Sequence, residues 1–383
     1  MRRHRFHLNV TAKCNGHCIH CYRDGGGKAI DPPLEVINVI LDRFKEIARM
    51  YYEHGYHALT VGGGEPTLRQ DLEDIIALAV RRQFKVRLVT NATLIDDERA
   101  FSLRRAGLTA VQVSLDGATE KTHDLIRGEG NWKRSINGIR ALKRAGVLTV
   151  LNYVLMPTIN MAEAPLLLDL ARVLKVGGVK FARIVPEGRA RANRLRTQGD
   201  YWDAYLRILD HAQSIRYKRL LFILDPLVRL LKVQNPKATA GLWGLALDQC
   251  HCNNTELVEV DGPTGDVYYC RVRTRLGNIW ADDLKQLWRQ HPLLRQIRRK
   301  APVGACIECS VWNGCRGGCP AVAKGISGQP LIQDANCQRV AQQPSLLDFR
   351  ATGYSNSQQR STTESLQGVG RKMKDTINWL VLR

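Results

Sequence analysis

The chain has 383 residues, with 57 Lys and Arg against 36 Asp and Glu, so its formal net charge is +21 at neutral pH. This length accommodates one large domain and one smaller one, each with its own core. No apolar run approaches the roughly 18 to 20 residues that span a bilayer, and the apolar run near the N-terminus is too short for a secretion signal. We therefore expect a cytoplasmic protein without membrane contact.

The excess of positive charge favours an acidic partner without identifying it. Four arginines lie within residues 189–196, and residues 285–300 hold six basic side chains and no acidic one. Such clusters attract a negatively charged peptide, a carboxylate-rich small molecule or nucleic acid. No RNA-binding signature accompanies them, which argues against nucleic acid. A solvated basic surface without a specific partner explains the same clusters equally well.

The first 225 residues alternate between short apolar runs and longer amphipathic stretches. The apolar runs have the length of strands buried on both faces; they are 6–10, 57–61, 86–90, 110–115, 147–155 and 179–185. Apolar residues at helical period predict the helices between them. The first helix is opened by Pro32 with Asp31 as its cap, and the others lie near 71–82, 96–106, 132–145, 161–175 and 200–217. Six such units in series predict an α/β fold with a parallel sheet and right-handed crossovers.

Three of the eleven cysteines, Cys14, Cys18 and Cys21, directly follow the first predicted strand with the spacing C-x3-C-x2-C. Thiolates hold iron–sulfur clusters, and four of them are the usual complement. Three thiolates would leave one iron open to a small-molecule ligand. A zinc site short of one ligand and three unrelated thiols are the alternatives.

The other eight cysteines lie in the C-terminal third of the chain. They are Cys250, Cys252, Cys270, Cys306, Cys309, Cys315, Cys319 and Cys337. Outside a secretory context, this number argues for metal ligation rather than disulfides. A pair of zinc ribbons is the alternative to iron–sulfur clusters.

The triplet resembles the cluster signature of the radical S-adenosylmethionine (SAM) superfamily, and the eight later cysteines resemble the SPASM domain, an extension that carries auxiliary iron–sulfur clusters. Segments after the predicted strands resemble the motifs that surround SAM in that family; their residues are Gly63, Gly64, Glu65, Asn91, Ser114, Asp116 and Arg127. The resemblance covers about residues 6–340. It implies a partial (β/α)6 barrel over 1–225 and a SPASM domain over 226–344, with 226–249 as a linker. Polar composition predicts a flexible tail over 345–383.

The resemblance implies a SAM-binding [4Fe–4S] cluster on the triplet and a common first reaction. The reduced cluster would cleave SAM to methionine and a 5′-deoxyadenosyl radical, which abstracts a hydrogen atom from the substrate. The resemblance implies that Glu65 and the adjacent glycines hold the SAM amino group. It also implies that Arg127 pairs with the SAM carboxylate or braces the fourth-strand loop. Asn152 is a weaker candidate for the adenosine region, with a structural hydrogen bond as the alternative.

Family connectivity assigns the eight later cysteines to two auxiliary [4Fe–4S] clusters. Cys250, Cys252, Cys270 and Cys319 would hold one, and Cys306, Cys309, Cys315 and Cys337 the other. Cys250 and Cys252 are closer together than the family spacing, which leaves open whether one or both clusters are fully ligated.

The family resemblance leaves the substrate open. We expect oxidative modification of a ribosomally made peptide, with tetrapyrrole propionate chemistry as the alternative and a non-enzymatic iron–sulfur or zinc scaffold as the alternative of another class. Sulfatase-maturing members of the family have an aspartate that acts as a base at the position of Arg271. A guanidinium cannot accept a proton at neutral pH, which argues against sulfatase maturation. We expect a one-electron donor such as flavodoxin or ferredoxin. Because the triplet starts only thirteen residues into the chain, leader recognition is expected to need a separate protein or the basic surface.

Overall fold

The computed structural model describes residues 5–23, 30–49, 57–242, 244–247, 257–270, 274–302, 304–328 and 333–337. Cys250, Cys252, Arg271 and the predicted tail at 345–383 lie outside these ranges. Within the described residues, no helix is long and apolar enough to cross a membrane.

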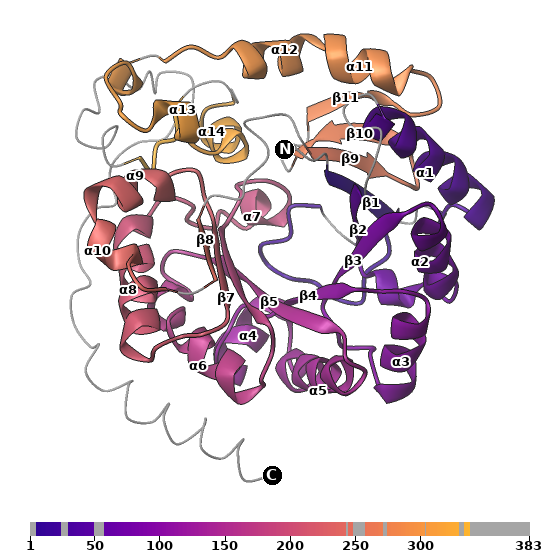
Figure 1. Cartoon of the computed structure of the whole chain (residues 1–383), viewed down its shortest axis with the longest axis horizontal. Helices are drawn as coiled ribbons and strands as arrows, with labels where there is room; N and C mark the ends of the chain where they lie inside the picture. The colour runs from indigo at the N-terminus through magenta and orange to yellow at the C-terminus, as the bar shows by residue number, and fades with distance from the viewer. Residues whose placement is uncertain are drawn as a thin grey trace.

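One curved sheet organises the described chain, and its first eight strands lie side by side in chain order, all parallel (Figure 1). These strands are β1 (Arg5–Thr11), β2 (His57–Gly63), β3 (Phe84–Thr90), β4 (Ala110–Ser114), β5 (Leu148–Leu155), β6 (Gly178–Arg183), β7 (Leu220–Leu224) and β8 (Leu245–Leu247). The α/β class and the partial barrel are confirmed. The two extra strands, β7 and β8, continue the barrel beyond the six that the sequence predicted.

Helices cover the outer side of this sheet (Figure 1). In the barrel they are α1 (Leu34–Arg49), α2 (Leu72–Arg81), α3 (Asp97–Arg105), α4 (Glu120–Arg127), α5 (Asn131–Arg144), α6 (Leu166–Val173), α8 (Tyr201–Ser214), α9 (Val228–Gln234) and α10 (Pro236–Thr239). The short helix α7 (Arg189–Ala192) instead lies toward the centre of the barrel in Figure 1. Apolar residues at helical period form the buried face of α1: Ile37, Ile40, Leu41, Phe44, Ile47 and Ala48. The predicted start is wrong: α1 begins at Leu34, and the Asp31 carboxylate instead accepts a hydrogen bond from Lys13 Nζ at 3.0 Å.

Alternation along the strands separates an apolar outer face from a more polar inner face. Phe6 on β1 stacks on Phe44 of α1 with ring centroids 4.7 Å apart, so this side of β1 faces the helices. The strand register places Leu59 and Val86 on the same outer side, and all three side chains are fully buried. Residues one position away along each strand therefore face the barrel interior.

The C-terminal part meets both edges of the barrel sheet. At one edge, β9 (Leu257–Asp261) pairs parallel with β1, and β10 (Asp266–Tyr269) and β11 (Thr274–Asn278) continue from it as antiparallel strands. The chain then forms α11 (Leu284–Gln290), α12 (Pro292–Arg299), α13 (Trp312–Cys315) and α14 (Pro320–Ser327). At the other edge, α13 packs beside α9 (Figure 1). The C-terminal region therefore contacts the barrel at both edges of its sheet.

Candidate functional site

The cysteine triplet lies on the loop that leaves the carboxyl end of β1, and the end of β2 holds the start of this loop. Gly64 N donates to Thr11 O and Glu65 N to Lys13 O, both at 2.8 Å. A Cβ on Gly64 would lie 2.0 Å from Lys13 O, so the backbones could not approach this closely with another residue there. The glycines singled out in the sequence therefore position the cysteine loop.

Glu65 lies beneath this loop and is 2% exposed. Its Oε1 accepts hydrogen bonds from Thr67 N at 3.1 Å and from the hydroxyls of Thr67 and Thr90 at 2.6 Å, while Oε2 accepts from Asn91 N at 2.7 Å. Burial raises the pKa of this carboxyl and the four donors oppose the rise. Glu65 thus ties the ends of β2 and β3 together, and its proposed contact with SAM stays a prediction.

Polar residues that follow β3, end β4 and lie within β5 gather toward the same end of the barrel. Asn91 Nδ2 donates to Oδ1 of Asn15, a residue of the cysteine loop, at 2.8 Å. Ser114 lies opposite Asn152 in the parallel register of β4 and β5, and both side chains are buried. Asn152 Oδ1 is buried and has no hydrogen-bond partner among the described residues. An unpaired buried acceptor is costly unless a ligand completes it, so Asn152 is a better binding candidate than its sequence context suggested.

Asp116 and Arg127 form a buried ion pair beside Cys18. Arg127 Nε lies 2.6 Å from Asp116 Oδ2, and its Nη1 donates to Cys18 Sγ at 3.5 Å. His20 Nε2 lies 3.3 Å from the same Asp116 oxygen, and Val154 N donates to the other at 2.7 Å. Burial opposes ionisation of Asp116, but Arg127 and His20 hold its pKa below the usual range. The structure therefore shows Arg127 bracing the fourth-strand loop and facing the triplet.

Helix α7, which the sequence did not place near the triplet, supports the cysteine loop from the opposite side. Arg189 donates from its backbone N to Cys21 O at 2.8 Å and from Nε to Cys18 O at 2.9 Å. A Cβ on Gly188, whose φ is +55°, would lie 2.5 Å from Cys21 O. Gly188 and Arg189 therefore hold the cysteine loop, a role that the charge pattern did not reveal.

Two carboxylates of β9 anchor the chain just after the triplet. Arg23 Nη1 lies 3.1 Å from Glu259 Oε1, and its Nη2 pairs with Asp261. Asn9 of β1 also donates to Glu259 Oε1, at 2.9 Å. Sequence reasoning missed both carboxylates because only the pairing of β9 with β1 brings them to this place.

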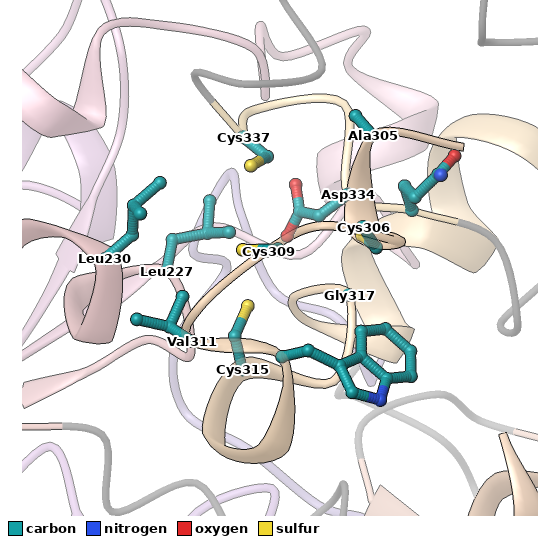
Figure 2. Close-up of a pocket in the computed structure, with 12 residues that line it drawn as sticks. Leu227, Leu230, Ala305, Cys306, Cys309, Val311, Cys315, Gly317, Asp334 and Cys337 are labelled. Carbon is teal, nitrogen blue, oxygen red and sulfur yellow. The ribbon is translucent and has the colours of Figure 1, made fainter. Parts of the chain in front are cut away.

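Four of the later cysteines line one pocket between the C-terminal region and α9 (Figure 2). They are Cys306, Cys309, Cys315 and Cys337, the set that the sequence assigned to one auxiliary cluster. Leu227, Leu230, Val311 and Trp312 supply apolar walls. The sulfurs of Cys309, Cys315 and Cys337 face one another across the pocket in Figure 2. Cys319 is not among the residues that line this pocket.

Asp334 joins this pocket to the barrel. It lines the pocket and accepts from Cys319 N at 3.0 Å, while Cys337 N donates to its backbone carbonyl at 3.0 Å. Arg183, the last residue of β6, donates hydrogen bonds to Asp334 from both terminal nitrogens. Its Nε lies 2.7 Å from Asp225 Oδ2. The side chains of this triad are at most 3% exposed. No sequence motif marks Arg183 or Asp334, whose pairing depends on tertiary contact.

The donor sets fit iron–sulfur clusters at both places. The triplet offers three thiols with the unpaired Asn152 acceptor at the same barrel end, and the pocket offers four thiols in an apolar setting. Among the described residues, no group of three or more His, Cys, Asp or Glu side chains is placed to hold a single metal ion. Because Cys250 and Cys252 lie outside the described residues, the assignment of Cys270 to a cluster with them stays a prediction.

Comparison with known proteins supports this interpretation. Residues 8–171 match the Radical SAM superfamily, and residues 252–310 match SPASM, an iron–sulfur cluster-binding domain. The mycofactocin maturase MftC of Mycobacterium ulcerans (strain Agy99) is 29% identical over 354 residues, 89% of each chain. The AdoMet-dependent heme synthase of Methanosarcina barkeri (strain Fusaro / DSM 804) is 26% identical over 338 residues, 86% of this chain and 94% of its own.

Solved structures share the fold. Native anSMEcpe with bound AdoMet gives a TM-score of 0.64 at 20% identity, over 88% of this chain and 95% of its own. Streptococcus suis SuiB bound to precursor peptide SuiA gives a TM-score of 0.63 at 17% identity, over 88% of this chain and 76% of the SuiB chain.

Proposed function

This chain is a radical SAM enzyme with a SPASM domain, as its sequence motifs predicted, and we propose that it oxidatively modifies a ribosomally made peptide. The observation that carries the proposal is the similarity to mycofactocin maturase along 89% of both chains, which includes the auxiliary-cluster region as well as the barrel. The fold shared with SuiB, solved with its precursor peptide, is compatible with a peptide in the barrel.

We propose that Cys14, Cys18 and Cys21 hold the SAM-binding cluster. When bound, the cluster and SAM supply a reductive cleavage that yields methionine and a 5′-deoxyadenosyl radical. Arg127 and the end of β2 orient the cysteine loop, and Arg127 holds a positive charge beside Cys18. The backbone at Gly63, Gly64 and Glu65, with Asn91, Ser114 and Asp116, would position SAM, and Asn152 would accept a hydrogen bond at its buried, unpaired amide oxygen.

The pocket cysteines Cys306, Cys309, Cys315 and Cys337 are proposed to saturate one auxiliary cluster, and Cys250, Cys252, Cys270 and Cys319 to hold a second. Abstraction of one hydrogen atom leaves a substrate radical that must lose another electron to give an oxidised product. A cluster with four protein thiolates has no open iron for substrate, so electron transfer is the role that remains for it. The same proposal includes flavodoxin or ferredoxin as the one-electron donor and a separate leader-recognition protein. It also includes a cytoplasmic location and the domain limits given above.

The test pairs the purified, iron-loaded enzyme with short peptides encoded beside its gene. With SAM and a one-electron reductant, the correct peptide should accelerate release of 5′-deoxyadenosine and emerge with its mass lowered by oxidation. Mass spectrometry of the peptide and chromatography of the nucleoside measure both products. Deoxyadenosine release that no such peptide alters would contradict the peptide assignment and leave the superfamily assignment intact.

Tetrapyrrole propionate chemistry is the second candidate. The similarity to a heme synthase over 86% of this chain favours it, and the related Fe-coproporphyrin III synthase of the same organism is 25% identical over 352 residues. Fe-coproporphyrin III belongs in the same assay as the peptides. Loss of carboxyl carbon as CO2 from this compound, with no change in any peptide, would establish the second candidate over the first.

A further inference from the structure

The inner face of the barrel carries polar side chains at the level of the strand centres. Strand register places Thr60 of β2 beside Arg87 of β3, and both lie on the face opposite Leu59 and Val86. Gln112 of β4 is buried on the same inner face. Its register partner on β3 is Val89, two residues after Arg87. Lys180 of β6 reaches across and donates from Nζ to Gln112 Oε1 at 3.3 Å. A guanidinium, an amide and an ammonium group therefore project into one part of the interior.

Four other largely buried arginines have carboxylate partners, whereas Arg316 donates to the backbone carbonyls of Ile297 and Arg298. Arg23 contacts Glu259 and Asp261, Arg69 contacts Asp71, Arg127 contacts Asp116, and Arg183 contacts Asp225 and Asp334. This is the expected pattern, because an unpaired buried charge is strongly unfavourable.

Arg87 departs from that pattern. Its Nη2 donates to Thr60 Oγ1 at 2.8 Å, but its Nε is buried without a hydrogen-bond partner, and no carboxylate pairs with it in the described part of the chain. Burial, and then the charge of Arg5, lower the pKa of Arg87 to about 10, so it remains positive at neutral pH. The protein thus maintains a cation in its interior without the counter-charge that those four arginines receive.

We propose that Arg87, with Gln112 and Lys180, binds a carboxylate group of the substrate inside the barrel. Arg87 lies three residues before the end of β3, so its backbone is roughly 10 Å below the edge where the cysteine loop lies. A guanidinium matches the planar shape of a carboxylate better than a single point charge does. The inference rests on the proposed function only in taking the barrel as the place where substrate binds, since acidic peptides and tetrapyrrole propionates both carry carboxylates.

The first experiment distinguishes a ligand-binding arginine from a structural one. Arg87→Met removes the charge but keeps a long apolar side chain. Arg183→Met makes the same change at a buried arginine with carboxylate partners, and Arg105→Met makes it at an exposed arginine. These two variants are the controls. In buffer without carboxylates, the melting temperature of the iron-loaded Arg87→Met protein should equal or exceed that of wild type, whereas Arg183→Met should lower it. If Arg87→Met lowers it as much as Arg183→Met does, the guanidinium is structural and the proposal is wrong.

The second experiment measures carboxylate binding without turnover. Glutarate is titrated against iron-loaded protein at constant ionic strength with chloride as the reference anion, and the shift in melting temperature gives a dissociation constant. Wild type and Arg105→Met should bind alike, and Arg87→Met should bind roughly 10- to 100-fold more weakly, the usual effect of losing a charged hydrogen bond. Equal binding by Arg87→Met, or no carboxylate-specific shift in wild type, would overturn the proposal.

The third experiment identifies the source of the carboxylate. The peptide found by the deoxyadenosine assay is compared with its fully amidated form, and Fe-coproporphyrin III with its tetramethyl ester. For the true substrate, neutralising the carboxylates should weaken binding to wild type and leave binding to Arg87→Met unchanged. Charge dependence seen only with the porphyrin would retain the carboxylate site and refute the peptide assignment. Charge dependence that is undiminished in Arg87→Met for both compounds would refute the site.

Discussion

The two cysteine regions of this enzyme are built in opposite ways. The triplet lies on a loop held by β2, α4, α7 and β9, elements far apart in the sequence. The four pocket cysteines come from one stretch of the chain, residues 306–337, and are enclosed by apolar side chains. The barrel thus provides a closely supported set of three thiols, and the C-terminal region provides a set of four. In the proposed function, this difference gives catalysis to the first set and electron transfer to the second.

The largest effect should follow from removing the triplet. Changing Cys14, Cys18 and Cys21 together to Ala should abolish deoxyadenosine release and remove about a third of the iron, because about four of about twelve irons depend on them if three clusters are present. Iron analysis and nucleoside chromatography measure the two effects. Deoxyadenosine release by a well-folded triple variant would show that SAM is cleaved elsewhere.

Removing one pocket ligand should separate the two reactions. Cys309→Ala should leave deoxyadenosine release largely intact and sharply reduce the modified product, because the substrate radical loses its electron acceptor. The ratio of product to deoxyadenosine is the measurement, with solubility and iron content recorded because a cluster also stabilises its domain. A folded variant that lacks the pocket cluster and keeps the wild-type ratio would show that the cluster is structural.

The connection between the two regions should matter to stability. Asp334→Ala leaves the buried Arg183 with one carboxylate fewer and should lower the free energy of unfolding by about 3 to 5 kcal/mol. Asp203→Ala breaks an exposed pair with Arg207 and should cost about 0 to 1 kcal/mol. Denaturant unfolding of the two variants under anaerobic conditions provides the comparison. Similar losses in both would show that the Arg183–Asp334 pair does not secure the C-terminal region.

A smaller effect is expected where α7 supports the triplet. Gly188→Ala and Gly146→Ala each force Ala into positive φ, which costs about 1 to 2 kcal/mol, but only at Gly188 would the new Cβ meet the cysteine loop. Gly188→Ala should therefore also weaken SAM binding and lower the iron content of the triplet site. SAM titration and iron analysis check this. Equal SAM affinity in the two variants would contradict the role given to α7.

The sequence predicted six barrel strands and most helices because each depends on a local pattern, either an apolar run or a helical period. The cysteine sets came from the resemblance to a known family. The sequence could not predict that Glu259 of β9 meets Arg23, two residues after the last cysteine of the triplet. That contact depends on the parallel pairing of β1 with β9, which joins residues about 250 positions apart. The same holds for Arg183 and Asp334. Arg87 carried no motif either, and its importance appears only when its partners are compared with those of the other largely buried arginines.

The most direct test of this account is the electron paramagnetic resonance spectrum of the reduced protein before and after addition of SAM. SAM should change one cluster signal, and that signal should be missing from the Cys14, Cys18 and Cys21 triple variant, while the signal that Cys309→Ala removes should be insensitive to SAM. A SAM-induced change that persists in the triple variant, or one that disappears in Cys309→Ala alone, would contradict the assignment of the open site to the triplet and the saturated site to the pocket.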